Sequence, residues 1–287
     1  MVVAAEGILS IQSHVAYGHV GNCAAVFPLQ RMGYEVWAVN TVQFSNHTGY
    51  GVWKGHANSV EQIREILAGV EERGAFGRTR AVVSGYLGDP RLGDAVLETV
   101  AKIRAARPGA LYACDPVMGD VGRGFFVRPG IPEFFRDHAV PAADIVTPNA
   151  FELAYLAGRS IDSLDDALAA AAAVRATGPS LVVVTSLELP GAAEEILVLA
   201  DTPEGSWLVR TPKLPLAVNG TGDATTALVL GNRLATENIP QVLQRSVSAM
   251  YELVRRTHEN GSREIELVAA QAAYQDPPRL FEVERVR

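Results

Sequence analysis

The amino-acid sequence predicts an α/β fold with a central, mostly parallel β-sheet and helices on both faces. Short runs rich in Ile, Val and Leu recur along the 287 residues, and longer segments with helical periodicity separate them. This alternation is typical of repeated β-α-β units around a parallel sheet. No internal repeat or low-complexity linker divides the sequence. We therefore expect a single domain over residues 1–287.

The period of the apolar residues separates the expected strands from the expected helices, because strands repeat every two residues and helices every 3.6. Strands are expected near residues 8–12, 36–42, 81–85, 110–114, 143–147 and 181–185. Helices are expected near residues 20–33, 59–72, 91–106, 150–157, 163–176, 224–235 and 240–259.

Two further segments carry local signals. The Ala-rich stretch 165–176 favours a helix by intrinsic propensity, and Asp162 or Ser163 is its expected N-cap. Strands near 195–201 and 206–210 are expected to form a hairpin, because the short segment between them contains a Pro and a Gly suited to a turn.

Polar residues follow each expected strand at the point where the apolar run ends. They are Gln12-Ser13-His14, Asn40-Thr41 with Gln43, Ser84-Gly85-Tyr86, Asp115, Thr147-Pro148-Asn149 and Thr185-Ser186. Each group taken singly is better explained as a cap at a strand end. In an open parallel sheet, however, ligands bind beyond the carboxyl ends of the strands. Together these groups predict a binding crevice at one edge of the sheet.

Charge and cysteine content narrow the class of protein. The net charge is −7 and no long Lys/Arg run occurs, so neither nucleic acid nor an anionic membrane is an expected partner. The two cysteines, Cys23 and Cys114, lack disulfide or zinc spacing, which fits a reducing compartment. The N-terminal residues show no signal-peptide pattern, and the most uniform apolar stretch, 168–174, is too short to span a bilayer. We expect a cytoplasmic protein.

The sharpest local motif is Asn219-Gly220-Thr221-Gly222-Asp223-Ala224, a glycine-rich turn that leads into an expected helix. Glycines let the backbone approach an anion, and the amides at a helix N-terminus bind phosphate. A carboxylate beside a phosphate repels it unless the carboxylate accepts the proton of an attacking hydroxyl group. From these residues alone, a helix cap explains Asp223 equally well.

Longer stretches of the sequence resemble the pyridoxal kinases, and the glycine motif resembles the anion hole and catalytic base of the wider ribokinase-like superfamily. The matching stretches are 13–15, 18–22, 42–50, 84–86, 114–120, 147–149 with Glu152, 185–186, 220–223 and 266–271. They span essentially the whole chain. The resemblance implies a ribokinase-like kinase domain that transfers the terminal phosphoryl group of ATP to the 5′-hydroxymethyl group of pyridoxal, pyridoxine or pyridoxamine in vitamin B6 salvage.

The resemblance also assigns roles at the vitamer end of the site. Ser13 and Thr48 are implied to hold the ring, and a lid near 43–56 is implied to close over it. The implied apolar walls are Val20, Phe44 and Tyr86. Asp223 is implied to be the catalytic base that touches the substrate, with Gly220, Thr221 and Gly222 as the anion hole. A pyridine ring needs flat apolar faces and hydroxyl partners for its polar atoms, so these residue types suit it.

The resemblance also assigns roles at the nucleotide end of the site. Asp115 and Glu152 resemble the acidic pair that orients Mg²⁺ on ATP, partly through water, and K⁺ is a further candidate ion. The alternative to metal binding is a structural role, in which Asp115 caps a loop and Glu152 is a solvated acid in the first turn of a helix. The expected nucleotide contacts are Asp115, Asp120, Thr147, Asn149, Glu152, Thr185, Ser186, Thr221 and Gly222.

The sequence departs from the branches of the family at two places. Thr185 stands where one bacterial branch carries a lysine, and the Thr185-Ser186 pair resembles the other branch, which includes animal enzymes, so any nucleotide contact there uses a hydroxyl group. The loop 119–124 is shorter than expected for that other branch, which leaves Arg123 open between a solvated loop residue and a phosphate contact.

Two other functions stay open. A sister kinase of the same superfamily acts on hydroxymethylpyrimidine or its phosphate, but it typically has a cysteine in the place of Asp223 and lacks the segment 47–50. A non-catalytic vitamin B6 carrier would keep the pocket without turnover, and the intact Asp223 argues against it. The expected partners are ATP and the B6 vitamers, and the resemblance implies a homodimer.

Overall fold

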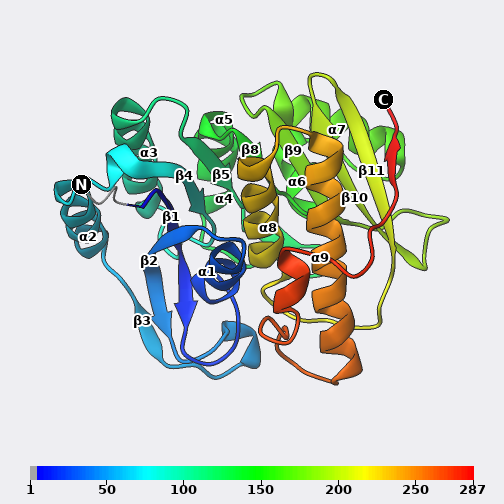
Figure 1. The fold of residues 1–287 in the computed structure, drawn as a ribbon, viewed down its shortest axis with the longest axis horizontal. Helices are drawn as coiled ribbons and strands as arrows, with labels where there is room; N and C mark the ends of the chain where they lie inside the picture. Colours follow the sequence, from blue (N-terminus) through cyan, green and yellow to red (C-terminus); the bar gives the residue numbers. More distant parts are fainter. Residues whose placement is uncertain (1–4) are drawn as a thin grey trace.

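The computed structural model describes residues 5–287, in which one large β-sheet is covered by helices (Figure 1). Within these residues the sheet has ten strands in the order β12-β11-β10-β9-β8-β5-β4-β1-β2-β3. The strands are β1 (Gly7–Val15), β2 (Glu35–Phe44), β3 (Gly55–Ala57), β4 (Thr79–Ser84), β5 (Leu111–Cys114), β8 (Ile145–Val146), β9 (Leu181–Leu187), β10 (Glu195–Thr202), β11 (Gly205–Pro212) and β12 (Val283–Arg285). From β2 through β1, β4, β5 and β8 to β9 the neighbours are parallel, and antiparallel strands extend both edges.

Helices cover both faces, as predicted. The helices are α1 (Asn22–Arg31), α2 (Val60–Glu72), α3 (Leu92–Ala106), α4 (Ile131–Phe134), α5 (Val140–Ala142), α6 (Ala150–Ala157), α7 (Leu164–Arg175), α8 (Thr221–Ala235) and α9 (Ile239–Glu259). Along β1, Leu9 and Ile11 pack into a cluster with α2, α3, α6 and α7, whereas Ile8 packs with α1, α8 and α9. Successive strand residues point to opposite faces, so this alternation builds two cores. In Figure 1, α1, α8 and α9 lie together on one side of the sheet.

The predicted elements are confirmed to within a few residues, and their ends are informative. Ser163 is the N-cap of α7, because its side chain accepts a hydrogen bond from the Asp166 amide. The hairpin of β10 and β11 is confirmed, with Thr202 paired to Gly205. One helix begins earlier than predicted: α8 starts at Thr221, with Gly220 as its N-cap in the left-handed region at φ 87°.

Several short elements were not predicted. They are β3, the small hairpin of β6 (Gly119–Asp120) with β7 (Gly124–Phe125), the helical segment of α4, α5 and a π-turn (Phe135–Ala139), the 3₁₀ turns at Thr48–Tyr50, Phe76–Arg78 and Gln271–Tyr274, and β12. They are short or exposed, and so carry little periodic signal. Within residues 5–287 there is also no helix with the length and apolarity needed to cross a bilayer.

Candidate active site

The site residues expected from the sequence meet in one cavity of about 260 Å³ at the carboxyl edge of the parallel strands. This is where an open α/β sheet places its ligands. The expected residues that line it are Ser13, Val20, Phe44, Thr48, Tyr86, Asp115, Asp120, Thr147, Asn149, Glu152, Thr185, Ser186, Gly220, Thr221, Gly222 and Asp223. The chain thus brings together side chains from the ends of β1, β2, β4, β5, β8 and β9 and from the start of α8.

One end of the cavity is apolar with a few hydroxyl groups. Ser13 is buried near the end of β1, within the register shift against β2 between Gln12 and His14. The loop that follows returns so closely that a Cβ on Gly21 would lie 2.3 Å from Ser13 Oγ. Val20 is buried beside it, and Phe44 packs against Trp53 with ring centroids 4.3 Å apart. This end can hold a flat ring between apolar faces.

The segment between β2 and β3 forms the rim of this end. Thr48 opens a short 3₁₀ turn, Thr48–Tyr50, and lines the cavity while remaining exposed. His47 caps the turn, because its Nδ1 accepts a hydrogen bond of 3.1 Å from the Gly49 amide. Pairing of Phe44 with Gly55 brings the segment back to the sheet edge. The expected lid thus exists as a folded segment at the cavity mouth.

The glycine turn stands at the opposite wall. A Cβ on Gly220 would lie 1.9 Å from the His19 carbonyl oxygen, and its φ is 87°, so only glycine fits there. Thr221, Gly222 and Asp223 in the first turn of α8 line the cavity, and backbone amides in a first helical turn lack helical partners and can bind an anion.

Asp223 lies in the first turn of α8, three residues after the N-cap Gly220. The interpretation of Asp223 as the N-cap of this helix is therefore wrong. Asp223 is half-buried, and desolvation by the surrounding protein raises its pKa to about 6, although the Gly21 and Asp223 backbone amides act in the opposite direction. The helix N-terminus alone would have lowered this pKa, so burial outweighs it. At neutral pH the group is still mostly ionised and can accept a proton.

Two buried carboxylates, Asp115 and Glu152, also line the cavity. Asp115 follows β5 and is 4% exposed, and its Oδ2 has no hydrogen-bond partner among the described residues. Burial, followed by the charges of Glu152 and Asp223, holds the pKa of Asp115 well above its usual range. A buried oxygen without a partner costs free energy. A cation near Asp115 would remove that cost.

Glu152 is held more tightly than the sequence suggested. Its Oε1 accepts a hydrogen bond of 3.0 Å from the Met118 amide, and its Oε2 accepts one of 2.9 Å from the Asn149 amide. Asn149 caps α6 in return, since its Oδ1 accepts from the Glu152 amide. The residue is 4% exposed, so the alternative of a solvated acid is wrong. Burial raises the pKa of Glu152 to about 7.

The donor set fits Mg²⁺ held partly through water. Magnesium prefers carboxylate oxygens, keeps several waters and uses substrate phosphates as ligands. Asp115 offers an unpartnered buried oxygen, and Glu152 places a second acid nearby. Across residues 5–287 no three His, Cys, Asp or Glu side chains converge into a complete ligand set. An ion here would therefore need water and phosphate oxygens as well.

The remaining wall carries small polar groups at the ends of β8 and β9. Thr147 Oγ1 lies 2.6 Å from Thr226 Oγ1, and Asn149 Nδ2 donates to the Gly119 carbonyl oxygen at 2.8 Å. Ser186 has a φ of 50°, the one positive φ at a residue other than glycine in the described part of the chain. Such backbone strain is concentrated at ligand-binding sites.

Several lining residues were not assigned a role from the sequence, and the polar ones among them are His47, Asn219 and Arg123. Arg123 lies in the turn between β6 and β7, and its guanidinium stacks on Phe126 at 5.2 Å from the ring centroid. It is the one Lys or Arg among the residues that line the cavity as described. In the sequence, the Gly-rich loop 119–124 was the one signal for a role of Arg123. The fold adds that this arginine lines the same cavity as Asp115 and Glu152.

Comparison with known proteins identifies the family. The family model described as phosphomethylpyrimidine kinase matches residues 47–267. The chain is 58% identical over 281 residues to pyridoxal kinase PdxY of Rubrobacter xylanophilus, and the match covers 97% of each protein. It is 54% identical to pyridoxal kinase PdxY of Deinococcus radiodurans, over 98% of this chain and 97% of the relative.

Solved structures agree with the sequence relatives. Pyridoxal kinase from Leishmania donovani in complex with ADP and pyridoxamine matches with a TM-score of 0.92 and 30% identity, over 98% of this chain and 99% of that chain. A putative phosphomethylpyrimidine kinase from Bacteroides thetaiotaomicron, in a crystal form with pyridoxal, matches with a TM-score of 0.89 and 26% identity, over 99% of this chain and 100% of that chain. The predicted ribokinase-like α/β fold is confirmed. The chain belongs to the pyridoxal kinase family.

Proposed function

We propose that this protein transfers the terminal phosphoryl group of ATP to the 5′-hydroxymethyl group of pyridoxal, giving pyridoxal 5′-phosphate and ADP. Pyridoxine and pyridoxamine are the related substrates. The observation that carries the proposal is the position of Asp223, one residue after the glycine turn, in the cavity that also contains the apolar ring-sized end and the acids. Full-length relatives named pyridoxal kinase support it.

The chain's own groups account for the transfer. The vitamer hydroxyl oxygen forms a bond to the γ-phosphorus while the bond from that phosphorus to the β-γ bridging oxygen breaks, and the hydroxyl proton passes to Asp223. The amides of Gly220 to Gly222 and the N-terminus of α8 stabilise the negative charge on the transferred group. Because the transition state is loose, orientation of the hydroxyl by the carboxylate matters more than basicity.

Substrate positioning is assigned to residues at the apolar end. Ser13 and Thr48 supply hydroxyl groups for the ring substituents, and Val20, Phe44 and Tyr86 supply the walls. Hydroxyl groups both donate and accept, so they can match a ring nitrogen, a phenol or an aldehyde.

The nucleotide lies at the other end in this proposal. Asp115 and Glu152 place Mg²⁺, partly through water, and the bound ion supplies charge neutralisation on the phosphates. Thr221 and Gly222 contribute amides, and Arg123, which lines the same cavity, is the proposed guanidinium contact to a phosphate. The other nucleotide contacts proposed are Asp120, Thr147, Asn149, Thr185 and Ser186, with K⁺ as a second candidate ion.

Phosphorylation of hydroxymethylpyrimidine or its phosphate is the second candidate, because the matching family model is described as phosphomethylpyrimidine kinase. The carboxylate at Asp223 and the folded segment 47–50 favour a vitamer instead. One coupled assay of ADP release with pyridoxal, pyridoxine, pyridoxamine and hydroxymethylpyrimidine decides between them. Turnover only with hydroxymethylpyrimidine would contradict the proposal, and binding of pyridoxal without turnover would indicate a carrier.

We further propose that the protein works as a homodimer in the cytoplasm. The family resemblance supports the dimer, and the paucity of cysteine supports a reducing compartment. Light scattering at micromolar concentration measures the mass directly, and a value near 30.7 kDa would contradict the dimer.

A further inference from the structure

Glu264 joins two segments of the active site that are distant in sequence. It follows α9, and its carboxylate accepts two hydrogen bonds. Oε1 accepts from the Tyr50 phenol at 2.5 Å, and Oε2 accepts from the backbone amide of His19 at 3.0 Å. Tyr50 ends the lid turn Thr48–Tyr50, and His19 belongs to the loop after β1 that carries Val20. One side chain thus contacts the lid and the floor of the vitamer cavity.

The lid turn has little burial to hold it in place. Thr48 and Gly49 are exposed and Tyr50 is half-buried. Thr48 lines the vitamer cavity, whereas Gly49 and Tyr50 line a second cavity behind the lid, so there is open space on both sides. A segment with few buried apolar contacts opens easily. Contacts made by Tyr50 therefore matter for the position of this turn.

Tyr50 has three such contacts, and the bond to Glu264 is the directional one. The Tyr17 ring meets the Tyr50 ring edge-on at 6.4 Å, and the Arg263 guanidinium lies 5.3 Å from the Tyr50 ring centroid. Donation to the Glu264 carboxylate is the main reason that the pKa of Tyr50 rises to about 12. The phenol therefore keeps its proton throughout the range of ordinary assays.

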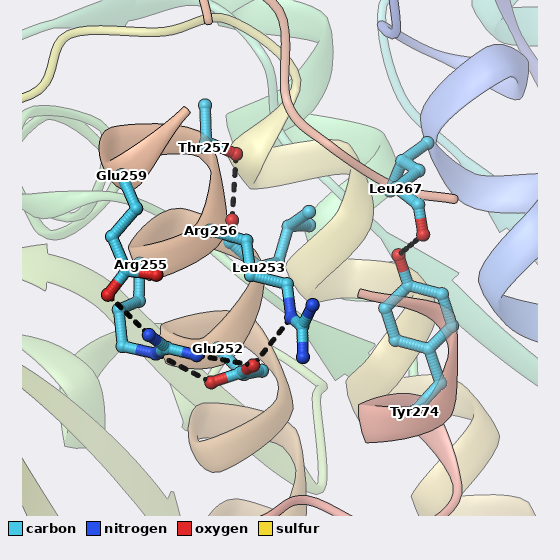
Figure 2. A network of polar contacts seen from close by, with 8 residues as sticks. All are labelled: Glu252, Leu253, Arg255, Arg256, Thr257, Glu259, Leu267 and Tyr274. Atoms are coloured by element: carbon cyan, nitrogen blue, oxygen red, sulfur yellow. Dashed lines mark hydrogen bonds and ion pairs between the residues drawn. The ribbon is translucent and has the colours of Figure 1, made fainter. Parts of the chain in front are cut away.

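Glu264 itself is firmly placed. The next residues, Ile265 and Leu267, are each 1% exposed and pack into a cluster with α1, α8 and α9. The Glu266 amide donates to Thr257 Oγ1 at 3.0 Å, and the Tyr274 phenol donates to the Leu267 carbonyl oxygen at 2.6 Å. Figure 2 shows Thr257 on α9. It also shows the hydrogen bond from the Tyr274 phenol to Leu267, which lies in the segment that follows α9. The segment is part of the core and can serve as a fixed anchor.

The same anchor reaches the anion hole. A Cβ on Gly18 would lie 2.4 Å from Glu264 Oε2, so the loop after β1 lies directly on this carboxylate. The His19 carbonyl oxygen in turn lies against Gly220, and Ile265 Cδ1 would be 3.2 Å from a Cβ there. Contacts therefore run without a gap from Tyr50 through Glu264 and His19 to the glycine turn before Asp223.

We propose that Glu264 is a positioning residue that latches the lid through Tyr50 and so places Thr48 over the vitamer. The proposal rests on the proposed function, because it names how the same site closes on its substrate. Loss of the latch leaves the chemistry at Asp223 intact and weakens retention of the vitamer. Loss of the hydrogen bond between Tyr50 and Glu264 should therefore raise the vitamer KM and not the ATP KM.

The test is a double-mutant cycle with Tyr50→Phe, Glu264→Ala and the double variant. Tyr50→Phe removes only the hydroxyl group and keeps both ring contacts. Each single change is expected to raise the pyridoxal KM by about three- to thirty-fold, the range for a partly exposed hydrogen bond to a charged group. In Tyr50→Phe the ATP KM should change less than about two-fold. Glu264→Ala also removes the acceptor of the His19 amide, so the cycle compares the pyridoxal KM alone. In the Glu264→Ala background, Tyr50→Phe should have no further effect, because the bond is already absent.

Tyr34→Phe is the matched control, since the Tyr34 phenol donates to the Gly231 carbonyl oxygen on α8, away from the lid. It should leave both KM values unchanged. If Glu264→Ala does not fold, Tyr50→Phe and the exchange measurement below carry the test without it. Additive effects of the two changes on the pyridoxal KM, or equal increases of the pyridoxal and ATP KM values in Tyr50→Phe, would overturn the latch.

A second readout separates failure of the latch from failure of the proposed function. Hydrogen exchange of the amides in segment 45–54 is measured without ligand, and faster exchange is expected in Tyr50→Phe than in the wild type or in Tyr34→Phe. Unchanged exchange in an active enzyme would overturn the latch alone. An inactive wild type with faster exchange in Tyr50→Phe would instead contradict the proposed function.

Discussion

The pKa values of three carboxylates in the cavity, Asp115, Glu152 and Asp223, are set mainly by burial. Asp223 stands in the first turn of a helix, where the dipole favours the ionised form, and yet its pKa rises to about 6 because the surrounding protein desolvates the half-buried residue. The sequence predicted the position of Asp223 through the Gly-Thr-Gly-Asp motif but not this balance, which depends on residues from several strand ends. For the same reason the sequence left Arg123 open, because nothing local indicates what a loop arginine faces.

The proposed vitamer contacts can be tested by single substitutions at Ser13 and Thr48. Ser13→Ala or Thr48→Val should raise the pyridoxal KM by about five-fold to two-hundred-fold, because loss of a hydrogen-bond partner for a buried polar group costs roughly 1–3 kcal/mol. The ATP KM should stay nearly constant. Steady-state kinetics with each substrate varied in turn measures both. Unchanged pyridoxal KM values in both variants would remove these residues from the vitamer site.

Whole elements were predictable where their periodicity is strong. The central strands and the long helices were predicted because each buries one apolar stripe. The 131–142 segment was missed, since Pro132 and Pro141 interrupt it. β3 was missed because its residues are exposed. The capping box of α6 also had a local signal, Asn149 with Glu152 three residues later, but its link to Met118 is visible only in the fold.

This link separates the roles of the two acids. Asp115→Asn should raise the Mg²⁺ concentration needed for half-maximal activity by roughly ten- to hundred-fold, the usual effect of losing a group that supports a metal site. Glu152→Gln should lower activity at every Mg²⁺ concentration, because its amide nitrogen would face a backbone N–H donor at Met118 or Asn149. Magnesium titrations of both variants provide the comparison. Full recovery of Glu152→Gln at high Mg²⁺ would contradict the structural part of its role.

At the scale of the whole molecule, one continuous sheet joins the N-terminal and C-terminal parts of the chain. Residues separated by more than 200 positions, such as Tyr50 and Glu264, meet at the site. Sequence patterns do not specify such long-range contacts. The family resemblance supplied the list of site residues, and the fold supplied their distances.

The continuous sheet supports our proposal of one domain over the chain. Trp37 lies on β2 and Trp207 on β11, toward opposite edges of the sheet. If both edges belong to one cooperative unit, the Trp37→Phe and Trp207→Phe variants, followed by tryptophan fluorescence and by circular dichroism in urea, should show coincident midpoints within each variant. Two separated transitions in either variant would indicate independent domains.

The central claim is that Asp223 accepts the proton of the vitamer hydroxyl group. Asp223→Asn keeps the shape of the side chain and removes the acceptor. It should lower kcat by roughly 10²–10⁴, the usual contribution of a positioned acid or base. Nucleotide affinity, measured by calorimetry on a variant shown to be folded by circular dichroism, should be unchanged or slightly tighter, because a negative charge near the phosphates is gone. A fall in kcat of less than about ten-fold, below the range for a positioned base, would contradict the account.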